Sequence, residues 1–242
     1  MIVLDVRDVY KTYVRGLRDA DVVAVRGVTL KLAAGEIVAV IGSSGCGKST
    51  LLHLCGGMDR PTHGDVRIEG RSLTTLDDDQ LTRVRREQIG FVFQFFNLLP
   101  TLTVAQNIGL PLLLAGQTEA EVARRAVAVS ARVGLSHRIE HYPQQLSGGE
   151  LQRAAIARAI IHTPSVLIAD EPTGNLDSEN GARVVELLLE LNQKFGVAIL
   201  LATHDDMVAS VAQRVLHMQD GRLVRVVTAT GVESPIDKGG KS

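Results

Sequence analysis

The chain has few aromatic residues and almost no net charge. Phe, Trp and Tyr make up 3% of its 242 residues, and 26 Lys and Arg nearly balance 27 Asp and Glu, for a formal net charge of -1. Proteins that bind nucleic acids usually carry an excess of basic residues or a clear basic stripe. The composition therefore disfavours a nucleic-acid partner.

Long hydrophobic runs are also missing. No stretch approaches the roughly 20 consecutive apolar residues that a helix needs to span a bilayer, and no N-terminal apolar segment resembles a signal peptide. With 45% apolar residues, the chain is nevertheless long enough to bury one large core or two small ones. We expect a protein on the cytosolic side of the membrane.

The sequence offers little that could bind a structural metal ion. Only two cysteines occur, Cys46 and Cys55, without the spacing of metal ligands, and we expect both thiols to be reduced. His137 and His141 are four residues apart, as in a helical metal pair, but Pro143 and the lack of a nearby third ligand argue against such a site.

A glycine-rich segment has the complete pattern of a phosphate-binding loop. It follows an apolar run typical of a strand, 36–41, and precedes a predicted helix, 48–55. The glycines let backbone N–H groups converge on phosphate oxygens, and the helix N-terminus adds a positive dipole end. We expect Lys48 to reach the β- and γ-phosphates, Ser49 to ligate Mg²⁺ and Thr50 to donate to a phosphate oxygen. The whole loop comprises Gly42, Ser43, Ser44, Gly45, Cys46, Gly47, Lys48, Ser49 and Thr50.

A second glycine pair lies at the start of another predicted helix, about a hundred residues later. Its segment comprises Leu146, Ser147, Gly148, Gly149 and Glu150. Two glycine-rich helix entrances imply two phosphate sites, so the sequence predicts a protein that acts on a nucleoside triphosphate.

The order of predicted elements is that of an α/β fold. Apolar or alternating runs predict strands at 2–9, 22–32, 36–41, 66–69, 89–93, 166–169 and 198–202, and a hairpin of 215–218 with 223–227 around Asp220 and Gly221. Helices are predicted at 77–87, at 118–133, with a capping box of Thr118 and Glu121, and at 179–195. The later strands and helix form the βαβ pattern of a parallel sheet, and the segment from about 95 to 163 is a helical insert. We expect the polar tail, 228–242, to be disordered.

Two carboxylates follow the buried strand predicted at 166–169. Ligands bind parallel sheets at the carboxyl edge of the strands, where Asp170 and Glu171 are expected to lie. Asp170 is placed to contact Mg²⁺ through water, and Glu171 is placed to polarise a nucleophilic water in line with the γ-phosphate. Without the phosphate loop upstream, two solvated acids capping a strand would be the better interpretation.

Two further polar residues follow predicted strands. His204 comes after the strand at 198–202, so it can contact the γ-phosphate or hold the attacking water at the same edge. Gln94 comes after the strand at 89–93, where its amide can complete a Mg²⁺ or water shell. The apolar segment behind it, 95–100, either packs inward or forms a docking surface.

These motifs together resemble the ATP-binding subunit of an ABC transporter from about residue 2 to 227. Residues 42–50 match the Walker A motif, and 166–170 with Glu171 match the Walker B motif and its catalytic glutamate. Gln94 matches the Q-loop, and His204 matches the switch histidine. The signature matches 146–150, and the D-loop matches 172–177, which ends at Asp177. Six motifs in the right order leave little room for chance. Within the family, the segments around Gln94, the D-loop and the signature resemble the lipoprotein-releasing and macrolide-export branch, although cell-division and permease-associated relatives share much of that pattern.

The resemblance implies a fold and an assembly. It implies a P-loop NTPase ABC cassette with a RecA-like parallel-sheet core, an N-terminal antiparallel β subdomain and an α-helical subdomain at about 95–163, within a single domain spanning 1–227. It also implies a homodimer closed by ATP, on the cytoplasmic face of the cell membrane, that drives a separate membrane permease. The apolar segment after Gln94 is the candidate for part of the dock.

The resemblance also implies roles for individual residues. Ser147 with the amides of Gly148 and Gly149 would bind the γ-phosphate of an ATP held by the other subunit's Lys48. Glu171 would act as the general base. Negative charge on the phosphate would be stabilised by Lys48, His204 and Mg²⁺. The Mg²⁺ ion would be held by Ser49, Gln94 and Asp170. Hydrolysis would then remove the bridging phosphate and release the dimer.

Three positions need comment against the family pattern. The signature most often ends in glutamine, where this chain has Glu150, and Leu151 replaces the glutamine that commonly follows. We expect the change at 150 to be tolerated, because Ser147 and the glycine amides bind the phosphate. The adenine-stacking aromatic is expected near the N-terminus, where Tyr13 fits the family spacing better than Tyr10.

Other classes of P-loop protein fit less well. A GTPase would carry an N-K-x-D motif, which is absent, and a small-molecule kinase would have no use for the second glycine pair. Soluble ABC proteins of DNA repair or translation usually have two cassettes or a long coiled coil, and this chain has neither. A mechanical regulator, whose motion signals to a membrane partner without transport, stays open as an alternative.

Overall fold

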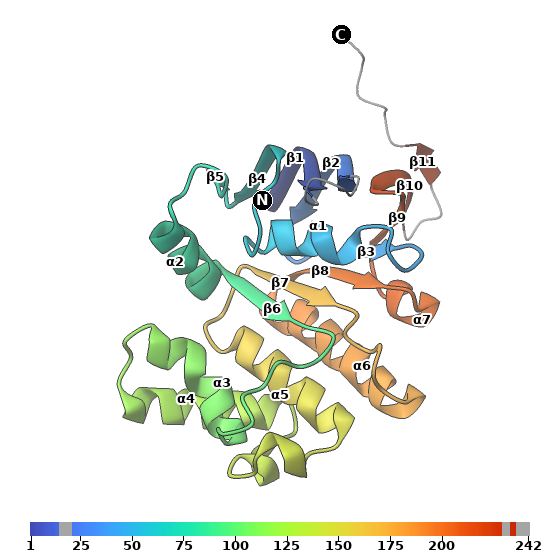
Figure 1. The fold of residues 1–242 in the computed structure, drawn as a ribbon. Helices are drawn as coiled ribbons and strands as arrows, with labels where there is room; N and C mark the ends of the chain where they lie inside the picture. The colour runs from blue at the N-terminus through green and yellow to red at the C-terminus, as the bar shows by residue number, and fades with distance from the viewer. Residues whose placement is uncertain (15–20, 229–232, 236–242) are drawn as a thin grey trace.

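The computed structural model describes residues 1–14, 21–228 and 233–235, which form two β-sheets and a set of helices (Figure 1). The smaller sheet has the order β2 (Val22–Ala33), β1 (Ile2–Tyr13), β4 (His63–Ile68) and β5 (Arg71–Ser72). The larger sheet has the order β11 (Glu233–Pro235), β10 (Arg222–Thr228), β9 (Arg214–Gln219), β3 (Ile37–Ile41), β8 (Ala198–Thr203), β7 (Val166–Asp170) and β6 (Ile89–Val92).

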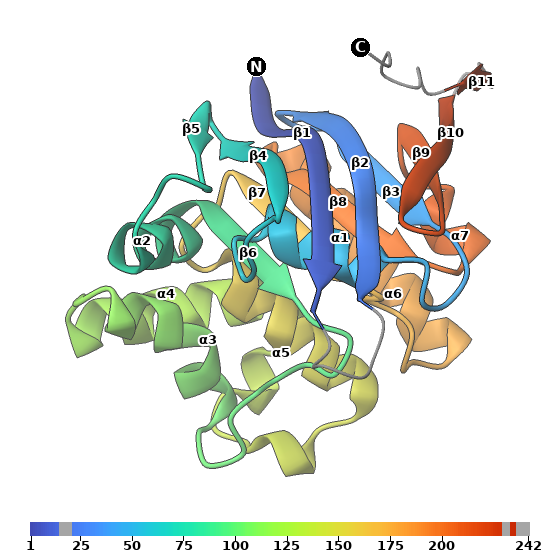
Figure 2. The same ribbon diagram turned by 45° about the horizontal axis from the view of Figure 1, so that its top comes forward.

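Helices lie on both faces of the larger sheet. They are α1 (Lys48–Cys55), α2 (Asp78–Gln88), α3 (Val104–Leu114), α4 (Glu119–Arg132), α5 (Gly148–Ile160), α6 (Ser178–Phe195) and α7 (Asp206–Ala209), with 3₁₀ turns η1 (Ser136–Arg138) and η2 (Pro143–Gln145). Helix α1 lies between the two sheets, whereas α5 and α6 cover the opposite face (Figures 1 and 2). The predicted helical segment, about 95–163, thus contains α3, α4 and α5.

The central strands are apolar along their whole length because both faces of the sheet are buried. On β3, Val38 and Val40 belong to the core shared with α1 and the smaller sheet, while Ile37 and Ala39 belong to the core shared with α5 and α6. Strands β3, β8, β7 and β6 are parallel. Ile41 pairs with Thr203, so the loops that follow these strands leave the sheet at one edge.

The C-terminal hairpin differs in part from the predicted tail. The strands β9 and β10 pair as predicted, but β10 includes Thr228, and β11 pairs antiparallel with β10, which differs from the disorder expected for 228–242. An exposed strand edge offers unpaired backbone groups that a further strand can satisfy. The rest of the predicted tail, 229–232 and 236–242, lies outside the described residues.

One predicted capping box is only half formed. Thr118 accepts a hydrogen bond from the backbone N–H of Glu121, as predicted, but the Glu121 carboxylate does not return to the cap. It accepts two hydrogen bonds from Arg124 instead, at 2.7 and 2.9 Å, because an ion pair one turn along the helix competes for the same oxygens.

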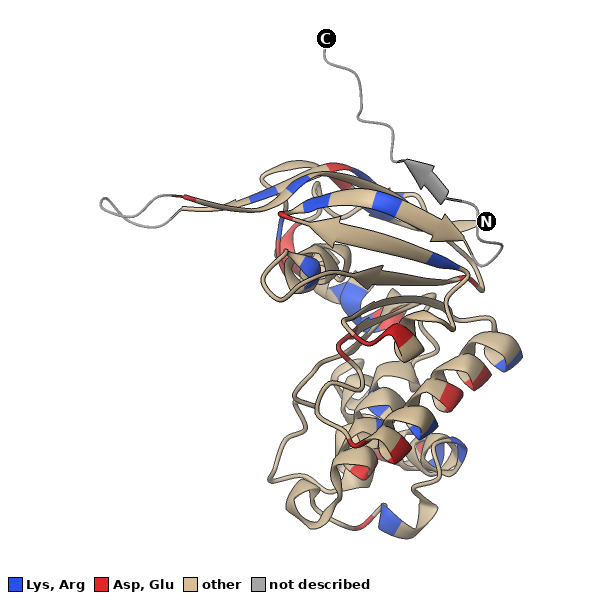
Figure 3. Ribbon diagram, turned by 90° about the vertical axis from the view of Figure 1, so that its right-hand side faces the viewer, with Lys and Arg blue, Asp and Glu red and all other residues tan. Residues whose placement is uncertain are grey.

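No helix within the described ranges is both long and apolar enough to cross a membrane. The longest, α6, spans 18 residues and carries ion pairs of Arg183 with Glu179 and Lys194 with Glu190. In Figure 3, blue and red segments alternate along the helices on this side of the molecule. Charges of both signs therefore cover the solvent face of α6.

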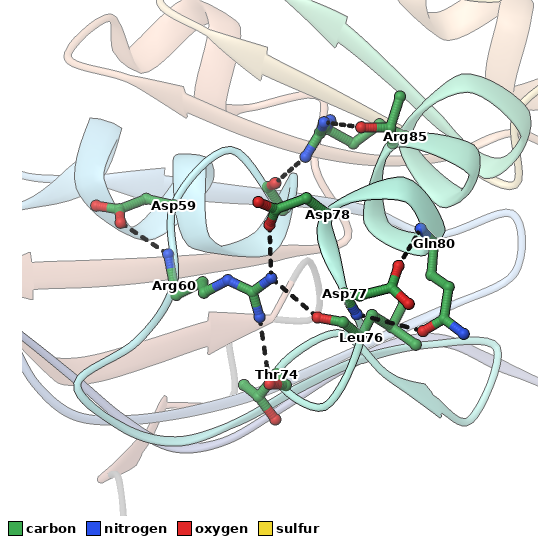
Figure 4. Close-up of polar contacts among 10 residues, drawn as sticks. Asp59, Arg60, Thr74, Leu76, Asp77, Asp78, Gln80 and Arg85 are labelled. Atoms are coloured by element: carbon green, nitrogen blue, oxygen red, sulfur yellow. Dashed lines mark hydrogen bonds and ion pairs between the residues drawn. The ribbon is translucent and has the colours of Figure 1, made fainter.

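Helix α2 is tied to the chain segment that follows α1. Arg60 donates to the backbone oxygen of Leu76 and to Asp78, both at 2.9 Å, and Arg85 donates to the backbone oxygen of Gly57 at 2.9 Å (Figure 4). These contacts join α2 to the segment that follows α1, and α2 itself lies beside the edge strand β6.

Candidate functional site

The phosphate loop runs from the end of β3 to the start of α1, and two of its glycines have no room for a side chain. A Cβ at Gly42 would lie 2.2 Å from the backbone oxygen of Met218, and a Cβ at Gly47 would lie 2.3 Å from that of Ala24. Gly47 also has a φ of 107°, and the helix N-terminus has no side-chain cap. The first N–H groups of α1 are thus free to bind an anion, which fits a phosphate cradle.

Lys48 lies inside this loop and is almost fully buried. Its ammonium group donates to the backbone oxygens of Gly42, at 2.8 Å, and Ser43, at 3.2 Å, and is 3.8 Å from Glu171. A buried ammonium needs such oxygen partners because desolvation of an unpaired charge is costly. Phosphate oxygens can replace these partners, so the geometry suits a lysine that contacts a nucleotide.

Asp170 and Ser49 together fit a divalent cation. Asp170 ends β7, and burial raises the pKa of its carboxyl group, opposed by a hydrogen bond with the Ser49 side chain. Its Oδ1 atom is buried and has no hydrogen-bond partner within the described residues. An orphaned carboxylate oxygen beside a hydroxyl is the donor set that Mg²⁺ prefers.

Glu171 leaves the sheet edge with an unusual backbone. Its φ is 47°, and its N–H donates to the backbone oxygen of Ala202, which holds the turn in place. Non-glycine residues rarely adopt this left-handed conformation, and such residues concentrate at functional sites. The turn brings Oε2 of Glu171 within 2.9 Å of Nδ1 of His204, so two residues from neighbouring strands meet.

Gln94 and the D-loop meet beside Glu171. The backbone oxygen of Gln94 accepts a 2.7 Å hydrogen bond from the side chain of Asn175, which joins the Q-loop to the D-loop. Asp177 caps α6 by accepting from the backbone and the side chain of Asn180, and these hydrogen bonds lower the pKa of its carboxyl group. Asp177 is therefore engaged at its own helix and does not line the cleft of the same chain.

A cleft of about 760 Å³ brings most of the predicted residues together. Its lining includes Tyr13, Ser44, Gly45, Cys46, Gly47, Lys48, Ser49, Thr50, Gln94, Glu171 and His204. Val22, Val23, Ala24, Arg26, Asp220 and Gly221 also line it. These six residues were not predicted to line the cleft. They come from β2 and from the turn between β9 and β10, and they reach the cleft only because these segments pack over the phosphate loop. A volume of this size suits a nucleotide.

Of the two candidate tyrosines, only Tyr13 lines this cleft. Its hydroxyl donates to Asp59 at 3.0 Å, and the ammonium group of Lys11 lies 4.9 Å from the ring centroid. Partial burial and the hydrogen bond to Asp59 raise the pKa of Tyr13. Tyr10 packs against His63 instead, with ring centroids 5.8 Å apart.

The signature residues lie outside the cleft of their own chain. Ser147 caps α5 in a complete capping box with Glu150, and Glu150 also accepts from Arg138 at 2.8 Å. Gly149 has no room for a side chain, since its Cβ would lie 2.3 Å from the side chain of Asn180. The helix start, with Ser147 and the two glycine amides, therefore does not contribute to the nucleotide cleft of its own chain.

The comparisons with known proteins agree with this geometry. The family model described as ABC transporter matches residues 25–174. The lipoprotein-releasing system ATP-binding protein LolD of Acinetobacter baylyi is 46% identical over 221 residues, which cover 91% of this chain and 96% of that protein.

Solved structures give the same result. The ATP-binding cassette MJ0796, a dimer in a post-hydrolysis state bound to ADP and Pi, superposes with a TM-score of 0.87 at 39% identity, covering 95% of this chain and all of that one. The cbiO1 protein of Clostridium perfringens, part of the ABC transporter complex cbiONQ, has a TM-score of 0.83 at 28% identity, covering 95% and 89%. The fold, the motif geometry and these similarities establish that the chain belongs to the ABC transporter family, as an ATP-binding protein.

Proposed function

We propose that this chain hydrolyses ATP between two copies of itself and thereby drives a membrane subunit of a lipoprotein-releasing or related export system. The observation that carries the proposal is the convergence of Lys48, Glu171 and His204 on one nucleotide-sized cleft, with Asp170 next to Glu171 at the end of β7. The similarity to the LolD protein supports the export branch.

Within the cleft, each residue has a chemical role. The amides of the phosphate loop and Lys48 bind the β- and γ-phosphates, and Glu171 takes the proton of the attacking water. His204, hydrogen-bonded to Glu171, orients that carboxylate and stabilises charge on the γ-phosphate.

The magnesium ion that accompanies ATP fits the residues around Asp170. Ser49, Gln94 and Asp170 would hold it, directly or through water, and the unpartnered Oδ1 of Asp170 supports this assignment. When bound, Mg²⁺ neutralises negative charge that develops on the phosphate oxygens. The assignment to Gln94 also agrees with its place in the cleft lining.

Two copies complete each site. Ser147, Gly148 and Gly149 bind the γ-phosphate of the ATP in the partner subunit, which agrees with their place outside their own cleft and with the dimeric state of MJ0796. ATP then contacts both subunits only in the closed state and favours closure by that difference in affinity.

The membrane subunit docks beside the Q-loop, and the complex sits peripherally on the cytoplasmic face of the membrane. A second pocket of about 240 Å³ lies there, with Arg86, Phe93, Arg158 and His162 in its lining. Nearby, Phe95 exposes 71% of its surface, which is unusual for an aromatic side chain without a partner. This apolar and cationic surface suits a helix of a membrane protein.

Co-purification tests the proposed partner. We expect the tagged chain, isolated from detergent-solubilised membranes of its own host, to bring down an integral membrane protein identified by mass spectrometry. Phe95→Asp should lower the recovery of this partner by about tenfold, as for an aromatic anchor at an interface. Val224→Asp, on an exposed position of β10 at the other end of the sheet, is the control and should retain it. Recovery of soluble proteins alone would contradict the proposal. A membrane partner without transport activity would favour the alternative of a mechanical regulator.

Tyr13 should stack on the adenine. Tyr13→Ala is expected to weaken ATP binding to the single chain by about tenfold, because base stacking on an aromatic side chain contributes roughly 1–3 kcal/mol. Tyr13→Phe keeps the ring and should bind ATP like the parent, and so should Tyr10→Ala, since Tyr10 does not line the cleft. Calorimetric titration measures all three. Parental affinity in Tyr13→Ala would contradict the assignment.

A further inference from the structure

The first turn of α5 carries a negative charge that is bound from three sides. The Glu150 carboxylate accepts from the N–H and the hydroxyl of Ser147, at 2.8 and 2.9 Å, and from Nε of Arg138, at 2.8 Å. The Glu150 side chain is 12% exposed and that of Arg138 is 34% exposed. Burial by itself would raise the pKa of Glu150, but hydrogen bonds from Ser147 and Arg138 outweigh it and lower the pKa to about 2, so this group is ionised.

This charge creates a problem for the proposed function, on which the inference rests. The γ-phosphate of the partner's ATP would approach Ser147 and the first amides of α5, only one helical turn from Glu150. Like charges repel strongly where water is excluded. In addition, the Ser147 hydroxyl donates its hydrogen to Glu150, so it must rotate away from the carboxylate before it can donate to a phosphate.

Arg138 is the residue that can relieve the repulsion. It lies in η1, twelve positions before Glu150, and its Nε binds the carboxylate oxygen that Ser147 does not use. A guanidinium is always charged and holds a carboxylate in a fixed geometry. It offsets the charge of Glu150, while the Ser147 hydroxyl still donates to the other carboxylate oxygen.

Other charged or titratable groups surround Glu150 less closely. His137 lies 3.8 Å from the same oxygen, His141 lies 3.3 Å from Arg138, and Arg153 interacts with Glu150 only through its charge. In the part of the chain that the structure describes, Arg138 is the cation with a hydrogen bond to this carboxylate.

We infer that Arg138 is a positioning residue for ATP-driven dimerisation: by neutralising Glu150, it allows the signature segment to bind the γ-phosphate of the partner subunit's ATP. The dependence on Arg138 exists because position 150 is a carboxylate. It should disappear when position 150 is a neutral amide.

A double-mutant cycle tests this dependence. We expect Arg138→Gln to lower ATP turnover, and ATP-dependent dimerisation in a Glu171→Gln background, by about tenfold, as for loss of one hydrogen bond between charged, partly buried groups. ADP binding to the single chain should not change. In a Glu150→Gln background, adding Arg138→Gln should change turnover less than twofold relative to Glu150→Gln alone. Arg138→Lys, which keeps the charge, should restore part of the loss.

The control is Arg124→Gln. Arg124 forms a similar pair with Glu121 on an exposed face of α4, and its loss should leave turnover unchanged. Thermal unfolding of each variant shows whether the helical layer stays folded. The inference is overturned if Arg138→Gln turns over ATP like the parent, or if it loses as much activity in the Glu150→Gln background as in the parent background. A parent protein that neither hydrolyses ATP nor dimerises with it would overturn the proposed function itself.

Discussion

Replacing Glu171 with glutamine should lower ATP turnover by at least about a hundredfold, because a general base contributes roughly 10²–10⁴ to the rate. The substitution keeps the size of the side chain and an oxygen that can accept from His204, so the cleft should keep its shape. It also removes one negative charge near the γ-phosphate. ATP binding should therefore persist, and the variant should accumulate as a dimer in ATP but not in ADP.

Steady-state hydrolysis and size-exclusion chromatography with each nucleotide measure these two effects. Glu186→Gln, on the exposed side of α6, is the matched control and should hydrolyse ATP and elute like the parent. If Glu171→Gln hydrolysed ATP at the parental rate, the assignment of the base would be wrong.

Replacing Ser147 with arginine should abolish turnover while leaving nucleotide binding by the single chain largely intact. The reason is spatial, since Ser147 caps α5 and lies outside the cleft that binds nucleotide in its own subunit. A bulky cation at the helix start would block the approach of the partner subunit's ATP.

The loss of the cap itself has a separate, smaller effect. Removing an N-terminal serine cap costs about 1 kcal/mol of stability. Ser147→Ala suffers the same loss without added bulk, so both variants should show a similar drop in unfolding temperature, whereas turnover should fall much further in Ser147→Arg. Loss of ADP binding by the Ser147→Arg monomer would point to misfolding instead of a blocked interface.

Apart from Tyr13, the last residue of β1, the cleft residues that are predictable from sequence follow strands or start helices. The short apolar run 36–41, the glycines after it and the helix 48–55 define the phosphate loop by local pattern alone, and the structure has the same helix bounds. Asp170, Glu171 and His204 were placed at one edge because parallel strands end together, as the pairing of β7 with β8 bears out.

Contacts between distant segments were not predictable, because local pattern carries no information on them. Arg138 and Glu150 meet only through the turn between α4 and α5, and Asp59 reaches Tyr13 across 46 residues. The residues of β2 and the β9–β10 turn join the cleft because Gly42 and Gly47 lie directly against the backbones of Met218 and Ala24. The formation of strand β11 likewise depends on the free edge of β10, which exists only once the sheet has formed.

Helix α5 carries Ser147 at its start and Arg158 near its end, and Arg158 donates hydrogen bonds to the backbone oxygens of Phe96 and Asn97. At a helical rise of 1.5 Å per residue, Ser147 and Arg158 lie about 16 Å apart along the helix axis. Because a helix of this length is stiff, a movement of the loop after Gln94 would also shift the start of α5. In the proposed assembly, a load on the membrane subunit would therefore reach the segment that binds the partner subunit's ATP.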